Sequence, residues 1–267
     1  MRPRYSKHSL IIVRASILLL GILPCGCSRP SEQAGDAGPG GRRQPLALSP
    51  ADELKVGRKA YEQVMTEVGS RIVPANSPDA LRVGRVAKRL VSAAEIEPLQ
   101  REILLRVRGY RFEWETNVVR DPQANAFCLP AGRIFVFTGI LPVIGERDDG
   151  LAAVVAHEMA HALAHHGSER VAREQESGGT FRRLSYDRMQ ESEADHIGIF
   201  IMTFAGYDPD EGVAFWERMQ RAHGGGLPEF LSDHPSDAHR AQALREWAPR
   251  ARAAKKAFDD GRIAPAR

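Results

Sequence analysis

The spacing of apolar residues predicts two helices in the first hundred residues, and each of them begins with a Ser-Pro pair. After Ser49-Pro50, apolar side chains recur at helical spacing up to Gly69, and after Ser77-Pro78 they recur up to Ala94. Serine is a favoured helix cap, proline is favoured in the first turn, and glycine commonly follows the last turn. We therefore expect one helix that ends at Gly69 and a second that starts at Pro78.

The apolar pattern changes from helical spacing to two-residue alternation at Ile103. Alternation over 103–107 and over 112–118 predicts two strands, and the apolar, β-branched and aromatic run at 133–138 predicts a third. Beyond Asp148 the spacing is helical again, with breaks near the glycines at 178–179 and 224–226. Two helices, a few strands and then several helices predict a helix-dominated α+β fold with a small, mostly antiparallel sheet.

The first 26 residues have the pattern of an export signal. Arg2, Arg4 and Lys7 precede the apolar run 17–23, which is too short to cross a membrane as a helix. Gly26-Cys27 then resembles a bacterial lipobox, so we expect a lipoprotein signal peptide over 1–26 and lipidation of Cys27. Cleavage nearby without lipidation, which gives a secreted or soluble periplasmic protein, is the alternative.

Glycine and proline dominate the segment that follows Cys27, and little of it is apolar. This composition is typical of a flexible tether, which we expect over 27–48, ahead of a domain over 49–250 and a tail over 251–267. Ser28 follows the candidate lipidation site. By resemblance to lipoproteins of bacteria with two membranes, it favours a lipid-anchored location at the periplasmic face of the outer membrane.

The overall composition excludes several classes of protein. The chain has 267 residues, of which 43% are hydrophobic and 27% are charged, so neither wholesale disorder nor a polytopic membrane protein fits. Four of the 37 basic residues lie within the first 26 positions, and the remaining 37 − 4 = 33 face 34 acidic residues. Without a basic excess in the body of the chain, we expect no nucleic-acid partner.

The sequence His157-Glu158-Met159-Ala160-His161 places two histidines one helical turn apart. On a helix both imidazoles lie on one face and can bind the same metal ion. Glu158 lies beside the first ligand, where it can take a proton from a metal-bound water. A helix that carries two histidines by chance is the alternative, and the helical context around the motif disfavours it.

A catalytic zinc site needs a third protein ligand, and the acidic cluster at 191–195 is the best source. Glu191 and Asp195 are four residues apart and lie on one helix face, so one can bind the metal while the other holds an imidazole. Glu193 points away from that face. We expect Glu191 to be the ligand and Asp195 to hold a ligating histidine, the alternative being an exposed acidic face.

An HExxH motif followed by ExxAD on a later helix resembles the gluzincin metallopeptidases of the HtpX and CAAX prenyl protease type, in particular their periplasmic lipoprotein (BepA- and LoiP-like) members. Further elements of the resemblance follow in order along the chain, from about residue 50 to residue 247. They are a strand at 112–119, a segment at 125–132 similar to NAFxLPGG, Ala205-Gly206-Tyr207-Asp208-Pro209, and His234-Pro235 with Arg240. In the second of these, Ala131 stands where the family has glycine.

The resemblance implies a zincin-like domain with one Zn²⁺ per chain. His157, His161 and Glu191 would be its ligands, Glu158 the general base, and the strand at 133–138 the edge on which an extended substrate pairs. Arg240 would stabilise the developing oxyanion or position His234. We further hypothesise that His234 occupies the open position of the zinc and holds the enzyme latent, with a structural role in its loop as the alternative.

Three other side chains are candidates for chemistry with simpler interpretations. His165 and His166 follow the HExxH motif, and we interpret them as histidines that interact with the negative end of the helix dipole. Cys128 has no identifiable base, so we expect a small buried residue rather than a nucleophile.

These observations predict a zinc metalloendopeptidase that degrades misfolded or unassembled envelope proteins. The alternative is a metal-containing periplasmic chaperone or assembly factor for outer-membrane proteins that rarely cuts. An intact HExxH motif favours the enzyme, because a protein that only binds has no need for Glu158.

Overall fold

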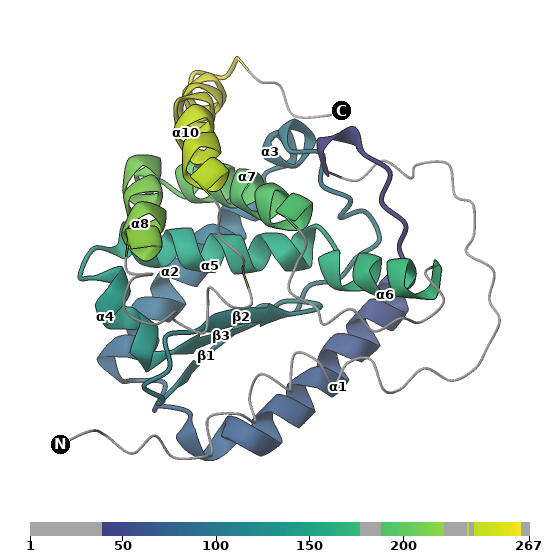
Figure 1. Ribbon diagram of the computed structural model, residues 1–267, viewed down its shortest axis with the longest axis vertical. Helices are drawn as coiled ribbons and strands as arrows, with labels where there is room; N and C mark the ends of the chain where they lie inside the picture. Colours follow the sequence, from purple (N-terminus) through teal and green to yellow (C-terminus); the bar gives the residue numbers. More distant parts are fainter. Residues whose placement is uncertain (1–38, 177–187, 222–233, 235–237, 263–267) are drawn as a thin grey trace.

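The computed structural model describes residues 39–176, 188–221, 234 and 238–262. Three strands form one small sheet, in the order β1-β3-β2 (Figure 1). The outer strand β1 (Glu115–Val119) pairs parallel to β3 (Arg133–Phe137), and β2 (Ala126–Leu129) pairs antiparallel to it. The sheet is therefore mixed, with one parallel and one antiparallel pair.

Helices cover both faces of this sheet. Phe135 and Phe137 share one apolar cluster with α1, whereas Ile134 and Val136 belong to the main core with α2 and α5. Beyond α5 lie α7 and α8, which pack on α5, and α10, which packs on α7 and α8 (Figure 1). The helix bounds are α1 Pro50–Val68, α2 Pro78–Ala94, α3 Glu97–Glu102, α4 Leu141–Ile144, α5 Asp148–Leu163, α6 His166–Glu176, α7 Arg188–Phe204, α8 Pro209–Arg221 and α10 Ala238–Asp259.

Helix α5 is the centre of the molecule. Every residue from Gly150 to Leu163 is buried, as expected for a helix that is apolar on most sides and packs between a sheet and other helices. Helix α7 crosses it closely at Gly198, where an added Cβ would lie 3.1 Å from the backbone nitrogen of His157. This close approach brings the acidic residues of α7 to the histidines of α5.

The helix-dominated α+β architecture is confirmed. Ser49 and Ser77 cap α1 and α2 with their side chains, as their positions before proline predict. Among the described residues, no helix combines the length with the apolar character that membrane crossing requires.

One predicted strand is absent, and one observed strand was not predicted. Residues 103–107 form no strand, because the short helix α3 ends just before them and Leu104 has a positive φ of 53°, which interrupts an extended run. Residues 126–129, which carry no clear alternation, form the edge strand β2. Ala131 lies in the turn between β2 and β3. Its φ of 64° is in the left-handed region that glycine adopts most easily.

Two of the expected domain limits also differ from the structure. Residues 42–48 pack against α6 and α7, and Gln44 is fully buried, although a flexible tether over 27–48 was expected. Helix α10 continues to Asp259 with Ala251 in the core, so the chain from 251 to 259 is part of the domain and not a tail. Over 42–48 the contacts are polar and leave no apolar pattern, whereas Ala251, Ala254 and Phe258 do follow helical spacing but come after Pro249, a residue that commonly ends a helix. The predicted signal peptide and Cys27 lie outside the described residues.

Candidate metal centre

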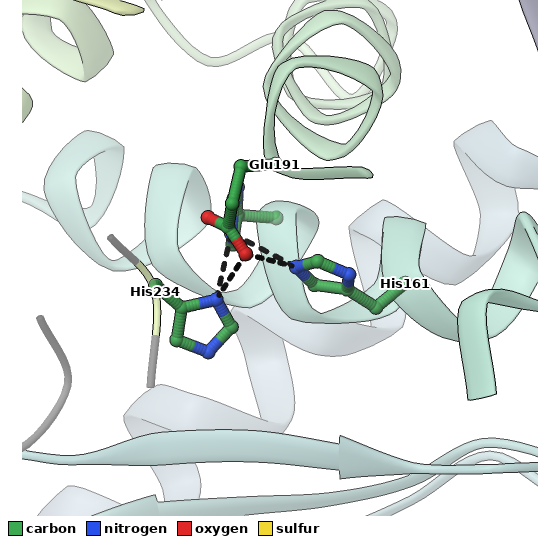
Figure 2. A group of neighbouring side chains, drawn as sticks. His161, Glu191 and His234 are labelled. Carbon is green, nitrogen blue, oxygen red and sulfur yellow. Dashed lines mark hydrogen bonds and ion pairs between the residues drawn. The ribbon is translucent and has the colours of Figure 1, made fainter. Parts of the chain in front are cut away.

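Four buried side chains direct ligand atoms toward one point between α5 and α7. His157 and His161 come from α5, Glu191 from the first turn of α7, and His234 from the segment before α10. Their candidate ligand atoms all lie within 4.8 Å of one another, and Figure 2 shows the Glu191 carboxylate facing the rings of His161 and His234. The structure thus brings together the three ligands that the sequence suggested and His234.

The distances within this group fit a small four-coordinate cation. The Nε2 atoms of His157 and His161 are 3.1 Å apart, and each lies 3.4 Å from a carboxylate oxygen of Glu191. His234 Nδ1 lies 3.0 Å from Glu191 Oε1 and 3.3 Å from His157 Nε2. Ligands about 2.0–2.1 Å from a tetrahedral zinc ion are about 3.3–3.4 Å from one another, so nitrogen and oxygen donors at these separations suit zinc.

Glu158 lies at the same centre. Its side chain is buried, and its Oε1 is 3.3 Å from Nε2 of His234. The ring of His234 therefore faces Glu191 with one nitrogen and Glu158 with the other.

Cys128 is a buried thiol whose pKa is raised by burial and by the charge of Glu158, as expected for a residue that is not a nucleophile.

The nitrogen of His157 that faces away from the other candidate ligands, Nδ1, contacts a carboxylate, which in turn pairs with an arginine. His157 Nδ1 is 2.9 Å from Asp195 Oδ1, and Arg240 donates to both Asp195 oxygens at 2.6 and 2.8 Å. Burial would raise the pKa of the Asp195 carboxyl, but the charge and hydrogen bonds of Arg240 outweigh it and lower that pKa. Asp195 therefore lies where it can hold the ring in the orientation that leaves Nε2 for a metal.

Arg240 lies beside two carboxylates of this centre. Besides Asp195 it contacts Glu191, at 2.9 Å, and its guanidinium lies over the Trp216 ring. It is buried among these groups, with only 7% of its surface exposed. Arg240 therefore holds the ligand Glu191 and the carboxylate behind His157.

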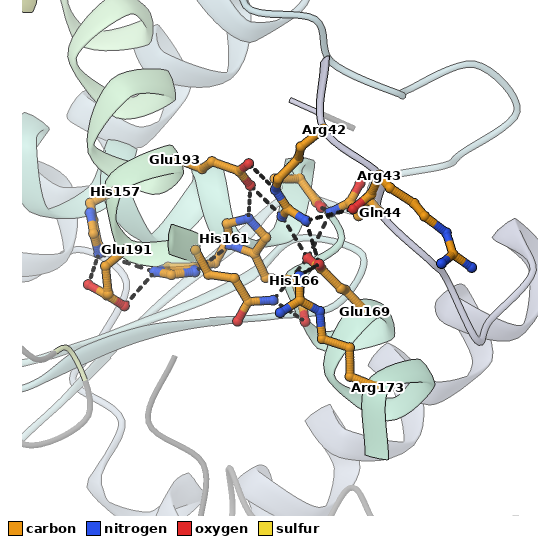
Figure 3. Close-up of polar contacts among 12 residues, drawn as sticks. Arg42, Arg43, Gln44, His157, His161, His166, Glu169, Arg173, Glu191 and Glu193 are labelled. Atoms are coloured by element: carbon orange, nitrogen blue, oxygen red, sulfur yellow. Dashed lines mark hydrogen bonds and ion pairs between the residues drawn. The ribbon is translucent and has the colours of Figure 1, made fainter. Parts of the chain in front are cut away.

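His161 is supported in a different way. Its Nδ1 lies 2.8 Å from Nδ1 of His166, and Nε2 of His166 lies 3.0 Å from Glu193, as drawn in Figure 3. Burial and the neighbouring histidines lower the pKa of His161 well below its ordinary value, which favours the neutral ring that binds metal. Glu193 points away from the four candidate ligand atoms, as expected. Its carboxylate contacts His166 and Arg42, and only 13% of its side chain is exposed.

The expectation that His165 and His166 serve the helix dipole is wrong. Helix α5 ends at Leu163, and His165, with a φ of 54°, redirects the chain so that His166 begins α6. His165 is fixed by Glu53, by the Arg106 carbonyl and by stacking on Tyr110. Sequence reasoning missed His166 as a partner of His161 because the two lie on different helices.

The prediction that an extended substrate pairs with the strand at 133–138 is also wrong. β3 is the central strand and is paired on both sides, so its backbone is not available. β2 is the outer strand beside α5, and within the part of the chain that the structure describes it pairs only with β3. The unpaired edge nearest the metal centre is therefore that of β2.

Comparisons with known proteins all point to metallopeptidases. A model of peptidase family M48 matches residues 93–178 and 175–248. The mitochondrial metalloendopeptidase OMA1 of Schizosaccharomyces pombe is 36% identical over 78% of this chain and 64% of its own length. OMA1 of Saccharomyces cerevisiae is 32% identical over 92% of this chain and 78% of its own length, and the metalloprotease LoiP of Escherichia coli is 25% identical over 76% and 83%. The chain thus spans slightly less than two thirds of the length of the Schizosaccharomyces pombe relative and more than two thirds of the other two.

These relatives correct the expected location. The fungal and plant relatives that share 32–36% identity with the chain are mitochondrial by name, which contradicts a lipid-anchored protein at the periplasmic face of a bacterial outer membrane. The physical reason is that the pattern of residues 1–26 does not distinguish a bacterial export signal from a mitochondrial targeting segment. Residues 1–26 contain basic and serine residues and no acidic residue, which is also the composition of mitochondrial targeting segments.

Proposed function

The chain belongs to peptidase family M48, and from that membership we propose that it is a zinc-dependent endopeptidase that cleaves unfolded or misassembled proteins. One observation carries the proposal: four buried donors, His157, His161, Glu191 and His234, converge from two helices and a loop with Glu158 beside them. A group that only stabilises the fold has no need of a buried carboxylate next to three histidines, because taking a charge out of water is costly even when it has a partner.

In this proposal His157, His161 and Glu191 hold the zinc. When bound, zinc polarises the scissile carbonyl and lowers the pKa of the attacking water. Glu158 accepts the proton of that water and returns it to the leaving amine. Asp195 and His166 keep the two imidazoles oriented, and Arg240 keeps Glu191 in place.

We propose that the substrate lies along β2 as an additional strand. The unpaired β2 edge beside α5 supports recognition through backbone groups, which suits segments without stable structure. Turnover of misfolded or unassembled proteins is the role that such recognition serves. The envelope setting expected from the N-terminus is not part of the proposal.

We also propose that His234 acts as a latch. Its Nδ1 lies among the ligand atoms, so a site that counts it has four protein donors, whereas catalysis needs one position for water or substrate. Its Nε2 faces the base Glu158 at 3.3 Å. Withdrawal of one side chain would therefore open the metal and release the base together.

The test uses the full chain and its Glu158→Gln variant, with Glu62→Gln on the exposed side of α1 as a matched control. Zinc content and casein cleavage are measured on each protein. We expect one zinc per chain in all three and cleavage lost only in Glu158→Gln. An absence of zinc would contradict the ligand assignment. Zinc without cleavage in any of the proteins would support latency or the alternative of a binding protein that rarely cuts.

A further inference from the structure

The segment that precedes α1 reaches into the interior beside the metal centre. Gln44 donates to the Ala164 carbonyl at 2.6 Å, and Leu48 N–H donates to Ser168 Oγ at 2.9 Å. In the same segment, Arg42 bridges two carboxylates from different helices, Glu169 of α6 and Glu193 of α7 (Figure 3). The segment therefore joins the two helices that flank His161.

The bridge made by Arg42 is bidentate on both sides. Its Nη1 and Nη2 lie 2.5 and 2.8 Å from the oxygens of Glu169, and Nη2 lies 2.7 Å from Glu193 while Nε contacts the other Glu193 oxygen. Only 16% of the arginine side chain and 13% of that of Glu193 are exposed. Planar two-point contacts of this kind fix the orientation of a carboxylate as well as its charge.

The two carboxylates depend on Arg42 to different degrees. Glu169 also accepts from Gln44 and Gln190 and pairs with Arg173 at 2.6 Å. Glu193 has Arg42 as its cationic partner and His166 as its other contact. Loss of Arg42 would therefore leave Glu193 as a largely buried carboxylate with no cationic partner, which is the more costly outcome.

Metal binding fixes the direction of every hydrogen bond from His161 to Glu193. If His161 binds through Nε2, its proton must be on Nδ1, which then donates to Nδ1 of His166 across 2.8 Å. His166 must accept there, so its own proton is on Nε2 and is donated to Glu193 across 3.0 Å. An oriented Glu193 carboxylate thus selects the His166 tautomer, and through it the His161 tautomer that binds metal.

We propose that Arg42 is a positioning residue for the metal centre, acting on His161 through Glu193 and His166. This inference rests on the proposed function, since it assumes that His161 is a zinc ligand. It makes the segment 42–48 a structural part of the site, so that a chain shortened to the start of α1 would hold zinc less well.

The test compares Arg42→Ala with Arg43→Ala, which removes the same charge from an exposed neighbour, in the full chain. Zinc affinity is measured by competition with a chelator, and the visible spectrum of the Co²⁺-loaded protein reports ligand geometry. Partners of metal ligands typically contribute 10–100-fold to metal affinity. We expect Arg42→Ala to weaken zinc binding about tenfold and to shift the Co²⁺ bands, Arg42→Lys to lie between, and Arg43→Ala to match the wild type.

A double-mutant cycle separates the route through Glu193 from a general loosening of the fold. In the Glu193→Gln background, Arg42→Ala should change zinc affinity less than about twofold, whereas in the Glu169→Gln background it should keep nearly its whole effect. Equal effects in both backgrounds would overturn the proposal. Circular dichroism of the metal-free proteins identifies any variant that fails to fold, and Arg42→Lys then carries the test.

The outcomes separate this inference from the proposed function. A wild-type chain that binds no zinc contradicts both. A wild-type chain that binds zinc and cleaves casein, with Arg42→Ala indistinguishable from Arg43→Ala in zinc affinity and Co²⁺ spectrum, overturns the role of Arg42 and leaves the peptidase proposal intact.

Discussion

His157 and His161 lie one turn apart on the same helix, yet the structure supports their rings in two different ways. Behind His157 a carboxylate, Asp195, is in direct contact with the ring and is itself held by Arg240. Behind His161 a second histidine, His166, stands between the ring and a carboxylate, Glu193. Both supports end in a carboxylate of α7 and an arginine from a distant part of the chain.

The difference concerns what each support can transmit. A carboxylate in contact with an imidazole N–H raises the basicity of the ligand and fixes its tautomer. A neutral ring placed between the carboxylate and the ligating imidazole fixes the tautomer of that imidazole, but it transmits less of the carboxylate's negative charge. The support of His157 therefore acts mainly on the metal, whereas the support of His161 also fastens α6, α7 and the segment 42–48 together.

Removal of Arg240 would test the first support and should give the largest effect. Arg240→Ala leaves two buried carboxylates, Asp195 and Glu191, without this partner, and such a loss typically costs about 3–5 kcal/mol. We expect that decrease in the free energy of unfolding of the metal-free chain, measured with urea. Arg245→Ala, which breaks an exposed pair with Glu217, should cost less than about 1 kcal/mol. Similar losses in the two variants would refute the importance of the buried pair.

Acid titration would test the second support. Arg42 and the amides of Gln190 and Gln44 outweigh burial and lower the pKa of Glu169 from 4.5 to about 2. A carboxyl with a lowered pKa stabilises the folded chain above its ordinary pKa, and this stability is lost as the pH falls from about 4.5 through about 2. The difference corresponds to about 3 kcal/mol.

Glu169→Gln removes that titration, so the free energies of unfolding of the metal-free wild type and variant should converge by about 3 kcal/mol between pH 6 and pH 2. Denaturant unfolding at each pH measures both. A constant difference across this range would mean that Arg42 is not held by a charged Glu169, and the second support would then lack its anchor.

The sequence predicted the first support far better than the second. Asp195 could be placed because it lies four residues from Glu191 on one helix, a relation that helical geometry alone specifies. Arg42 lies 151 positions from Glu193, within a stretch of glycine and proline, and no local pattern connects the two. His166 follows a break in the helix at His165, whose positive φ is not marked by a glycine. Contacts set by helix periodicity were therefore predictable, and contacts set by chain reversal were not.

The same distinction applies to the fold. The helices at 50–68 and 78–94 begin at capping serines, and their starts follow from local chemistry. The strand β2 has a burial pattern set by α5 and α1 on its two faces, so its sequence shows no alternation. Which strand would be the free edge depends on the pairing order, and no property of a single strand reveals that order.

A direct comparison of the two supports comes from the side chains nearest the metal ligands. Asp195→Asn and His166→Gln each keep the approximate shape of the side chain but alter what it offers the ligand. We expect zinc affinity to fall by about 10–100-fold, with Asp195→Asn at the larger end because it removes a charge in contact with the ring. Chelator competition measures both. Equal losses would mean that the intervening ring transmits as much as a direct carboxylate, and the comparison would fail.

The smallest expected effect concerns the third histidine, His234, which contacts the proposed ligand Glu191 and the proposed base Glu158. His234→Ala leaves three protein ligands and frees Glu158 from this contact, so we expect zinc to be retained and casein cleavage to rise several-fold. His196→Ala, a histidine of α7 that packs on Trp247 away from the ligand atoms, is the control and should show no rise. The initial rate per zinc-loaded chain is the quantity to compare. Unchanged or lower cleavage with zinc retained would mean that His234 serves the structure of the site, so that the two supported histidines and Glu191 form the working site with or without it.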